Sequence, residues 1–156
     1  MHTKVTTRQE LASRLEERRR QGQRIVFTNG CFDLMHIGHI RYLQAARNLG
    51  DVLVVGVNSD ESVRALNKGA DRPIVPDAQR AEVLAALACV DYVVTFSEPD
   101  PGALIATLQP DILVKGGDWS VDRIVGRETV EARGGRVQTI PLVPGVSTTT
   151  LVQRIR

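Results

Sequence analysis

The chain has 156 residues, with 20 Lys and Arg against 18 Asp and Glu, a formal net charge of +2 and 42% hydrophobic residues. This length suffices for one domain with its own core, and so balanced a chain lacks the bulk positive charge that would favour nucleic acid as a partner. No apolar run is long enough to cross a membrane or to serve as a signal peptide, so we expect a cytoplasmic protein without a membrane partner.

The first third of the chain is predicted to form a helix, a strand and a second helix. The first helix has capping residues at Thr6 and Thr7 and ends near Gly22. Its basic run, 18–20, is typical of a solvated helix end. The elements expected next are a strand over 24–30 and a helix over about 36–48, closed by Gly50.

The rest of the chain repeats the alternation of strand and helix. Apolar runs rich in β-branched residues predict four further strands, within 51–60, 90–96, 111–118 and 136–143. Helices are expected over 61–67, 78–88, 101–109, 121–133 and 147–156, the last of them capped by Ser147. Asp51, Asp91 and Asp111 precede strands and are interpreted as turn residues rather than catalytic carboxylates.

This alternation predicts a single α/β domain over 1–156, with an N-terminal helix and tail over 1–23. We expect a Rossmann-like, five-stranded parallel sheet with helices on both faces. Ligands of such sheets bind at the carboxyl ends of the strands, so the loops after the first, second and fourth strands are the candidate site.

Several common site signatures are missing from these loops. No GxGxxG follows the first strand, and neither GxxxxGK[ST] nor GxSxG occurs, which disfavours a dehydrogenase, a P-loop kinase and an α/β hydrolase. The two cysteines, Cys31 and Cys89, lie far apart and predict neither a disulfide framework nor a zinc site.

His36 and His39 lie three residues apart beside a predicted helix start, in a chain with only three histidines. Residues at this spacing share a helix face, and Gly38 between them leaves room for a ligand. Imidazoles and the amides of a helix N-terminus suit a phosphate, and a bound polyphosphate would favour protonated rings. An isolated HxxH pair is also compatible with core packing, a surface position or half a metal site. Metal ligation is disfavoured because the one further imidazole is that of His2 in the tail, although Asp33 could contribute.

The stretch "TNGCFDLMHIGHIRYL" over 28–43 resembles the signature of the HxGH nucleotidyltransferase superfamily, in its cytidylyltransferase-like branch. The segments "VNSDESV", "RPIVPDAQRAEVLAALACVDYVVTF", "PDILVKGGDW" and "PGVSTTTLV" are similar, in order, to bacterial D-glycero-β-D-manno-heptose 1-phosphate adenylyltransferases. The resemblance runs from about Arg24 to the end of the chain.

That resemblance implies transfer of AMP from ATP to heptose 1-phosphate, giving ADP-heptose and pyrophosphate for lipopolysaccharide core biosynthesis. It implies Mg²⁺ bound through the substrate phosphates, and we assign the ion no protein ligand. Many relatives are fused to a sugar kinase, so we expect a stand-alone form that depends on a separate heptose kinase and phosphatase. Related enzymes are commonly dimers or larger, which makes a homodimer an expectation.

The resemblance also implies roles for individual residues. The expected catalytic contacts of the triphosphate are His36, His39 and Lys68. The expected nucleotide-binding residues are Asn29, Gly30, Cys31, Phe32, Asp33, Gly38, Lys115, Gly116, Gly117, Asp118, Trp119, Ser147, Thr148 and Thr149. The residues expected to bind the sugar phosphate are Asp60, Arg72 and Arg80.

Two positions depart from the family pattern. The segment "LNKGADRP", which holds Lys68 and Arg72, is one residue longer than the "LKGxxRP" pattern, so both cations are also compatible with a solvated loop. Trp119 stands where many relatives have Tyr, and a single Trp is also compatible with packing.

Three alternatives stay open. A glycerol-3-phosphate cytidylyltransferase shares the HxGH and "GDW" segments, but "LVPGVSTT" lacks the arginine of that group's "RTEGISTT". A GTP-using heptose 1-phosphate guanylyltransferase is excluded by no residue. A non-catalytic nucleotide-binding module would keep the fold without needing both histidines, the glycines of "KGGD" and the hydroxyl cluster together.

Overall fold

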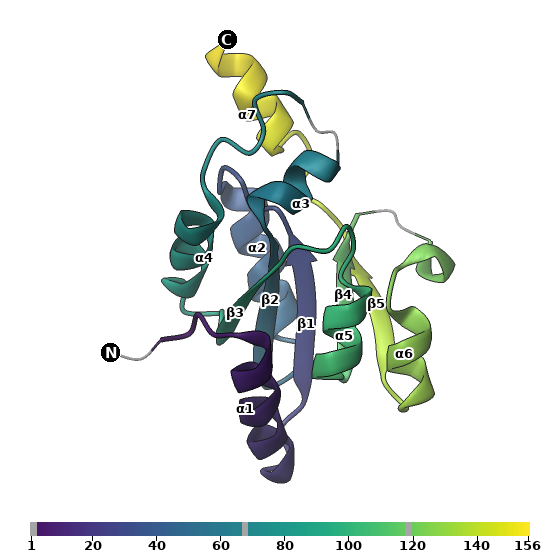
Figure 1. Cartoon of the computed structure of the whole chain (residues 1–156). Helices are drawn as coiled ribbons and strands as arrows, with labels where there is room; N and C mark the ends of the chain where they lie inside the picture. The colour runs from purple at the N-terminus through teal and green to yellow at the C-terminus, as the bar shows by residue number, and fades with distance from the viewer. Residues whose placement is uncertain (1–2, 67–68, 118–119) are drawn as a thin grey trace.

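The computed structural model describes residues 3–66, 69–117 and 120–156, and its centre is a five-stranded parallel sheet (Figure 1). The strands, in chain order, are β1 (Ile25–Gly30), β2 (Val52–Asn58), β3 (Tyr92–Phe96), β4 (Ile112–Gly116) and β5 (Arg136–Ile140). Their order across the sheet is β3-β2-β1-β4-β5, and every pairing is parallel. The predicted fold class is confirmed.

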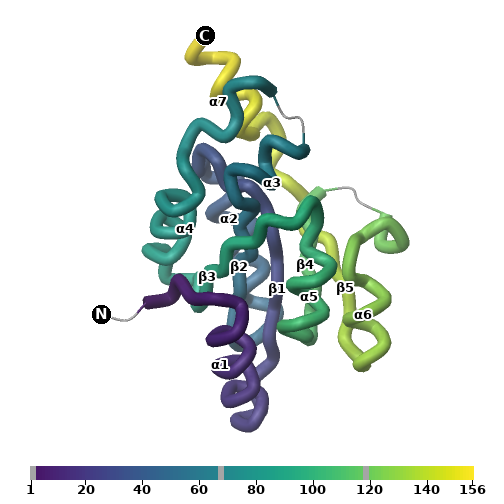
Figure 2. Tube along the Cα trace, in the orientation of Figure 1, coloured from purple at the N-terminus to yellow at the C-terminus, as the bar shows by residue number. Residues whose placement is uncertain are grey.

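Helices pack on both faces of this sheet (Figure 1). One face carries α1 (Arg8–Arg20), α5 (Gly102–Leu108) and α6 (Arg127–Ala132), and the other carries α2 (Ile37–Arg47) and α4 (Asp77–Ala85). The tube view shows α3 (Asp60–Ala65) and α7 (Thr148–Ile155) beyond the carboxyl ends of the strands (Figure 2). None of the helices among the described residues is long and apolar enough to cross a membrane.

Alternation along β1 shows why both faces need a cover. Ile25 and Phe27 are fully buried in the cluster with α1 and α5, whereas Val26, between them, is fully buried in the cluster with α2 and α4. Successive side chains of a strand point to opposite faces, so a continuous apolar run requires helices on each side. The central strand β1 is therefore covered on both faces, which leaves its carboxyl end as the place open to a ligand.

Several expected elements differ in their bounds, and two of the differences have a clear cause. The helix expected over 121–133 is a 3-10 turn, η1 (Val121–Arg123), followed by the separate helix α6. Gly126 breaks it with φ of +94°, and a Cβ there would lie 2.6 Å from Ile105. The fifth strand ends at Ile140, because Pro141 cannot donate to the ladder.

The basic run at the end of α1 is less solvated than predicted. The Arg18 Nε donates to the hydroxyl of Tyr92 at 3.1 Å, and Arg19 donates to the carbonyls of Leu108 and Gln109. Only Arg20 matches the expectation, with its side chain 71% exposed. The run therefore ties α1 to β3 and to the end of α5.

Three aspartates connect neighbouring strands at the amino edge of the sheet. Asp51 accepts the amide N–H of Arg24, Asp91 that of Leu53, and Asp111 that of Ile25, each at 2.8 Å. All three precede strands, as their assignment as turn residues requires. They lie at the opposite edge from the loops expected to bind ligand.

Candidate active site

The two histidines of the HxGH element form the cap of α2. His36 has φ of −140° and is the N-cap residue just before the helix, rather than part of its first turn. Its Nδ1 accepts the N–H of Gly38 at 3.1 Å, and the Nδ1 of His39 accepts the N–H of His36 at 3.2 Å. Two of the amides expected to meet a phosphate are thus bonded to the histidine rings.

These bonds select one tautomer of each ring. A neutral imidazole whose Nδ1 accepts a hydrogen bond carries its proton on Nε2, so both rings are Nε2–H donors. The rings stack with centroids 3.9 Å apart, and the ring of Phe32 lies 5.3 Å from that of His39. Burial lowers the pKa of His36. Protonation of the His36 Nδ1 would remove the hydrogen bond that caps α2. Protonation of the rings by a bound polyphosphate stays a prediction.

A pH dependence of stability follows from this cap. Because the folded pKa of His36 is lowered, its contribution is fully present above the ordinary value of about 6.5 and declines as the pH falls below it. His36→Asn keeps a capping oxygen but has no titration. We expect the free energy of urea unfolding of wild type, relative to that of His36→Asn, to decrease between pH 7.5 and 5.5. A relative stability of wild type that stays constant or rises over this range would contradict the lowered pKa of His36.

A cavity of about 470 Å³ opens at the carboxyl ends of β1 and β4, where the strand order reverses. It gathers most of the residues expected to bind nucleotide or phosphate from three separate loops. Those lining it are Asn29, Gly30, Cys31, Phe32, Asp33, His36, Gly38, His39, Arg72, Lys115, Gly116, Ser147, Thr148 and Thr149.

The last helix closes one side of this cavity. Ser147 caps α7 by accepting the N–H of Thr150 at 3.0 Å, and the hydroxyl of Thr148 lies 3.4 Å from the carbonyl of Leu34. The first amides of a helix lack intrahelical partners and carry partial positive charge. The beginning of α7 therefore presents N–H donors opposite the histidines of α2.

Four apolar or aromatic lining residues were not predicted. They are Tyr42, Leu142, Val143 and Val146. Tyr42 follows His39 by three residues on α2, and that spacing was an available signal. Its hydroxyl bonds to the hydroxyl of Thr28 and lies 3.2 Å from the carbonyl of Val114, and burial raises its pKa to about 12.

Gly116 allows close packing at this apolar end of the cavity. A Cβ there would lie 3.0 Å from Leu142 and 3.2 Å from Tyr42. Any side chain at position 116 would fill the space between these two residues. The backbone of Gly116 therefore packs directly against Tyr42 and Leu142. The apolar lining residues at this end suit the faces of a planar aromatic ligand.

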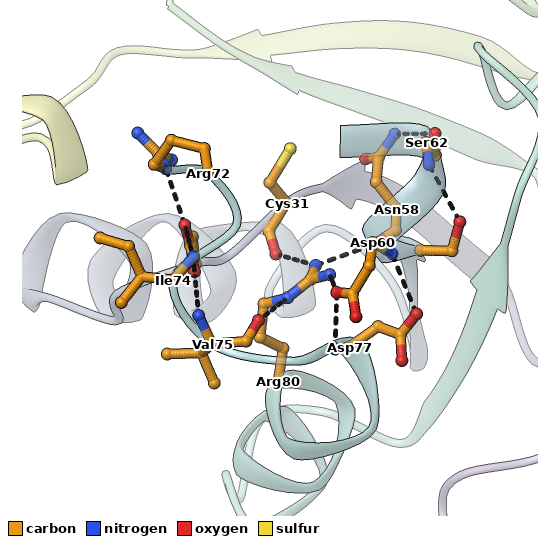
Figure 3. A network of polar contacts seen from close by, with 11 residues as sticks. Cys31, Asn58, Asp60, Ser62, Arg72, Ile74, Val75, Asp77 and Arg80 are labelled. Carbon is orange, nitrogen blue, oxygen red and sulfur yellow. Dashed lines mark hydrogen bonds and ion pairs between the residues drawn. The ribbon is translucent and has the colours of Figure 1, made fainter. Parts of the chain in front are cut away.

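Arg80 and Asp60, expected to bind the sugar phosphate, instead form an internal ion pair (Figure 3). Arg80 is 1% exposed and pairs with Asp60 at 2.8 Å. Its remaining bonds go to the carbonyls of Cys31 and Asn58, each at 2.7 Å, and of Val75 at 2.8 Å. Neither residue lines the cavity, so Arg80 suits anchoring of the loops rather than contact with a substrate.

Arg72 and Asp33 do line the cavity and are paired with each other. The Arg72 Nε donates to Asp33 at 2.7 Å, and their side chains are 8% and 0% exposed. The carboxylate of Asp33 also accepts the amides of Ile74 and Val75. These protein donors leave no vacant position for a cation, and the described residues include no group of three or more potential metal ligands.

A second cavity of about 270 Å³ adjoins the first across the end of β1. The two cavities share Asn29, Gly30, Cys31 and Lys115. Its other walls come from the ends of β2 and α3, the loop after β3, and the segment from η1 to α6; they are Asn58, Leu66, Pro99, Asp100, Pro101, Leu113, Arg123, Ile124 and Val125.

The remaining predicted residues lie elsewhere. Gly117, with φ of +91°, is absent from the cavity lining and donates its N–H to Ile140 at 2.8 Å. Lys68, Asp118 and Trp119 lie outside the described residues.

Comparison with known proteins supports this geometry. A family model described as cytidylyltransferase-like matches residues 27–154. The chain is 56% identical over 153 residues to the bifunctional protein HldE of Syntrophotalea carbinolica, and 55% identical over 153 residues to that of Geotalea uraniireducens. Each alignment covers 98% of this chain but 31% of the relative, so the chain spans about a third of their length.

Two solved structures share the fold. The lipopolysaccharide core biosynthesis protein of Thermoplasma volcanium is 30% identical, with a TM-score of 0.65 over 78% of this chain and 98% of that chain. A pantoate-beta-alanine ligase of Francisella tularensis, 16% identical with a TM-score of 0.61 over 95% of this chain and 75% of its own, supports the fold alone. The resemblance inferred from the motifs is confirmed, and the chain belongs to the cytidylyltransferase-like family.

Proposed function

We propose that this chain is a nucleotidyltransferase that moves AMP from ATP to D-glycero-β-D-manno-heptose 1-phosphate and releases pyrophosphate. The observation that carries the proposal is the cavity, which joins two Nε2–H imidazoles, the Arg72 guanidinium and the beginning of α7 around one anion-sized space. The heptose motifs and the identity to HldE proteins support the choice of substrates.

ATP lies along the first cavity in this proposal. Its base packs against the apolar lining formed by Leu142, Val143 and Val146, and its phosphates extend toward the histidines. The first amides of α7 bind the outer phosphates, because a helix N-terminus is a ready anion site. Arg72 binds a phosphate through its two terminal nitrogens, the geometry in which a guanidinium binds phosphate best.

The chemistry needs no protein nucleophile or general base. An ionised oxygen of the sugar 1-phosphate attacks the α-phosphorus, forming one P–O bond while the bond to the bridging oxygen of the β-phosphate breaks. Pyrophosphate leaves with that electron pair, and no proton moves at the reacting oxygens. His36 and His39 donate from Nε2 to the oxygens on which charge accumulates, and this stabilises the transition state.

The sugar of the acceptor occupies the second cavity. That space is contiguous with the first at Asn29, Cys31 and Lys115, so a phosphate placed at the shared wall reaches the α-phosphorus while its sugar points away. Asp100 and Arg123 supply polar groups for sugar hydroxyls, and Ile124 supplies an apolar wall for the C–H face of the ring.

Mg²⁺ fits this site through the phosphates. The lining offers N–H, hydroxyl and guanidinium donors, which suit phosphate oxygens, whereas its carboxylate, Asp33, is already saturated. The bound ion would neutralise phosphate charge during transfer. We further propose that residues 1–156 act as one cytoplasmic nucleotidyltransferase unit, that they form a homodimer, and that a heptose kinase and a phosphatase act in the same pathway.

A matrix of substrates tests the function. Pyrophosphate release is measured with ATP, GTP or CTP against both heptose 1-phosphate anomers and glycerol 3-phosphate. We expect turnover only when both substrates are present, fastest with ATP and the β-anomer. Preference for GTP would favour a guanylyltransferase, and preference for CTP with glycerol 3-phosphate a cytidylyltransferase. ATP binding without turnover across the panel would indicate a non-catalytic module.

A further inference from the structure

Asp33 looks like a ligand-binding residue in the sequence but behaves as an internal anchor. Its residue is 2% exposed although the carboxylate lies at the wall of the nucleotide cavity. Both oxygens accept protein donors: the amides of Ile74 and Val75 at 2.8–3.0 Å and the Arg72 Nε at 2.7 Å. A carboxylate so fully bonded has no acceptor position to offer a ribose hydroxyl or a metal ion.

Arg72 is held by one end only. Its single Nε–H is used by Asp33, which leaves the four N–H groups of the two terminal nitrogens. Within the described part of the chain, no acceptor is paired with those nitrogens, and Arg72 lines the nucleotide cavity. Figure 3 shows the end of the Arg72 side chain directed away from Ile74 and Val75. The anchored Nε therefore fixes the direction of a guanidinium whose donors remain available.

Anchoring matters because an arginine is otherwise mobile. A free arginine side chain loses most of its rotamer entropy when it is immobilised by a ligand. Here part of that loss has occurred on folding, since the side chain is 8% exposed and bonded before any ligand arrives. The two amide bonds to Asp33 hold the backbone after Arg72 in the same way.

We propose that Asp33 is a positioning residue, which acts on the phosphates of the nucleotide by orienting the terminal nitrogens of Arg72 into the cavity. The inference rests on the proposed function for the identity of the anion, but not for the coupling between the two side chains. Burial works to raise the pKa of Asp33, and the amides of Val75 and Ile74 together with Arg72 outweigh it, so that the pKa is lowered. The anchor is accordingly ionised throughout the neutral pH range.

A double-mutant cycle on binding tests this role. Dissociation constants for ATP and for inorganic pyrophosphate are measured by titration calorimetry for wild type, Asp33→Asn, Arg72→Ala and the double variant. In Asp33→Asn one carboxylate oxygen becomes an NH₂ group, which cannot accept a hydrogen bond from Arg72 or the neighbouring amides, so Arg72 is released. We therefore expect ATP and pyrophosphate binding to weaken about 10-fold or more. In the Arg72→Ala background the same change should weaken binding by about 2-fold or less, because there is no guanidinium left to orient.

Asp91→Asn is the matched control. Asp91 also accepts a backbone amide, that of Leu53 at 2.8 Å, and pairs with Arg47 at 3.2 Å, but it lies at the amino edge of the sheet. We expect a lower melting temperature and an unchanged ATP dissociation constant. Equal losses of binding from Asp33→Asn in both backgrounds would overturn the proposal, since a purely structural residue acts regardless of Arg72.

Two further outcomes are decisive. If Asp33→Asn does not fold, Arg72→Lys replaces it, because an ammonium can still pair with Asp33 but presents no second nitrogen to a phosphate. ATP affinity of Arg72→Lys equal to that of wild type would overturn the proposal, and affinity as weak as that of Arg72→Ala would support it. If Asp33 and Arg72 are coupled in ATP binding but no sugar phosphate is turned over, the proposed function is refuted and the positioning role of Asp33 stands. A wild type that binds neither ATP nor pyrophosphate would refute the function and the positioning role together.

Discussion

His36→Asn is expected to reduce turnover by a factor on the order of 10² or more while leaving the fold intact. Asparagine is a good N-cap and can accept the amide that the His36 Nδ1 accepts, so the beginning of α2 is preserved. The substitution removes the Nε2–H donor, which we assign to the charge that develops during transfer. The measurement is kcat for pyrophosphate release at saturating ATP and heptose 1-phosphate, with circular dichroism to monitor the helix.

His36→Ala and His39→Ala separate the two functions of these rings further. Each alanine variant removes both the cap and the donor, so we expect a comparable loss of turnover together with lower stability. His36→Asn should therefore equal His36→Ala in rate but exceed it in melting temperature. A near-normal rate in His36→Asn would show that capping is the only function of this ring.

Arg80→Met is expected to lower the free energy of unfolding by about 3–5 kcal/mol, the largest loss that we anticipate for a single substitution. Arg80 is 1% exposed, and its bonds join the ends of β1 and β2 to the loop before α4. Methionine fills much of the volume but leaves buried carbonyls and the carboxylate of Asp60 without their donors. Urea unfolding measures the loss, and the melting temperature should fall by roughly 6–20 °C.

Arg64→Met is the control for the same chemical change on a surface. Arg64 is an exposed residue of α3, so its replacement should change stability by less than about 0.5 kcal/mol. If the Arg80→Met variant is as stable as the Arg64→Met variant, the hydrogen bonds and ion pair of Arg80 make no net contribution to the free energy of unfolding. Retained stability with lost sugar-phosphate binding would instead restore the original assignment of Arg80 as a substrate ligand.

Much of the fold was predictable because each strand is a short apolar run and each helix has its own cap or end. The five strands and their alternation with helices are local properties, so they follow from residues a few positions apart. The error at 121–133 came from Gly126, which is a minor cost in a helix pattern but here adopts φ of +94° against α5. A side chain at this position would collide with Ile105 of α5, a tertiary neighbour that no local pattern contains.

The histidine pair was predictable for the same reason, and the two buried arginines were not. A three-residue spacing brings His36 and His39 together whether the first is the N-cap or lies inside the helix. Arg80 bonds to a carbonyl 49 residues earlier, and Arg72 to a carboxylate 39 residues earlier. One signal for Arg80 was present: Ala81 and Leu84 share its buried face of α4, so the arginine lies on the apolar side of an amphipathic helix.

The three aspartates at the amino edge have a consequence for how this scaffold can diverge. Asp51, Asp91 and Asp111 each clamp the start of a neighbouring strand, and none contributes to either cavity. Strand register is thus secured about a strand length away from the chemistry. The loops at the carboxyl ends of the strands can therefore change in sequence, and with them the substrate specificity, while the strand register is kept.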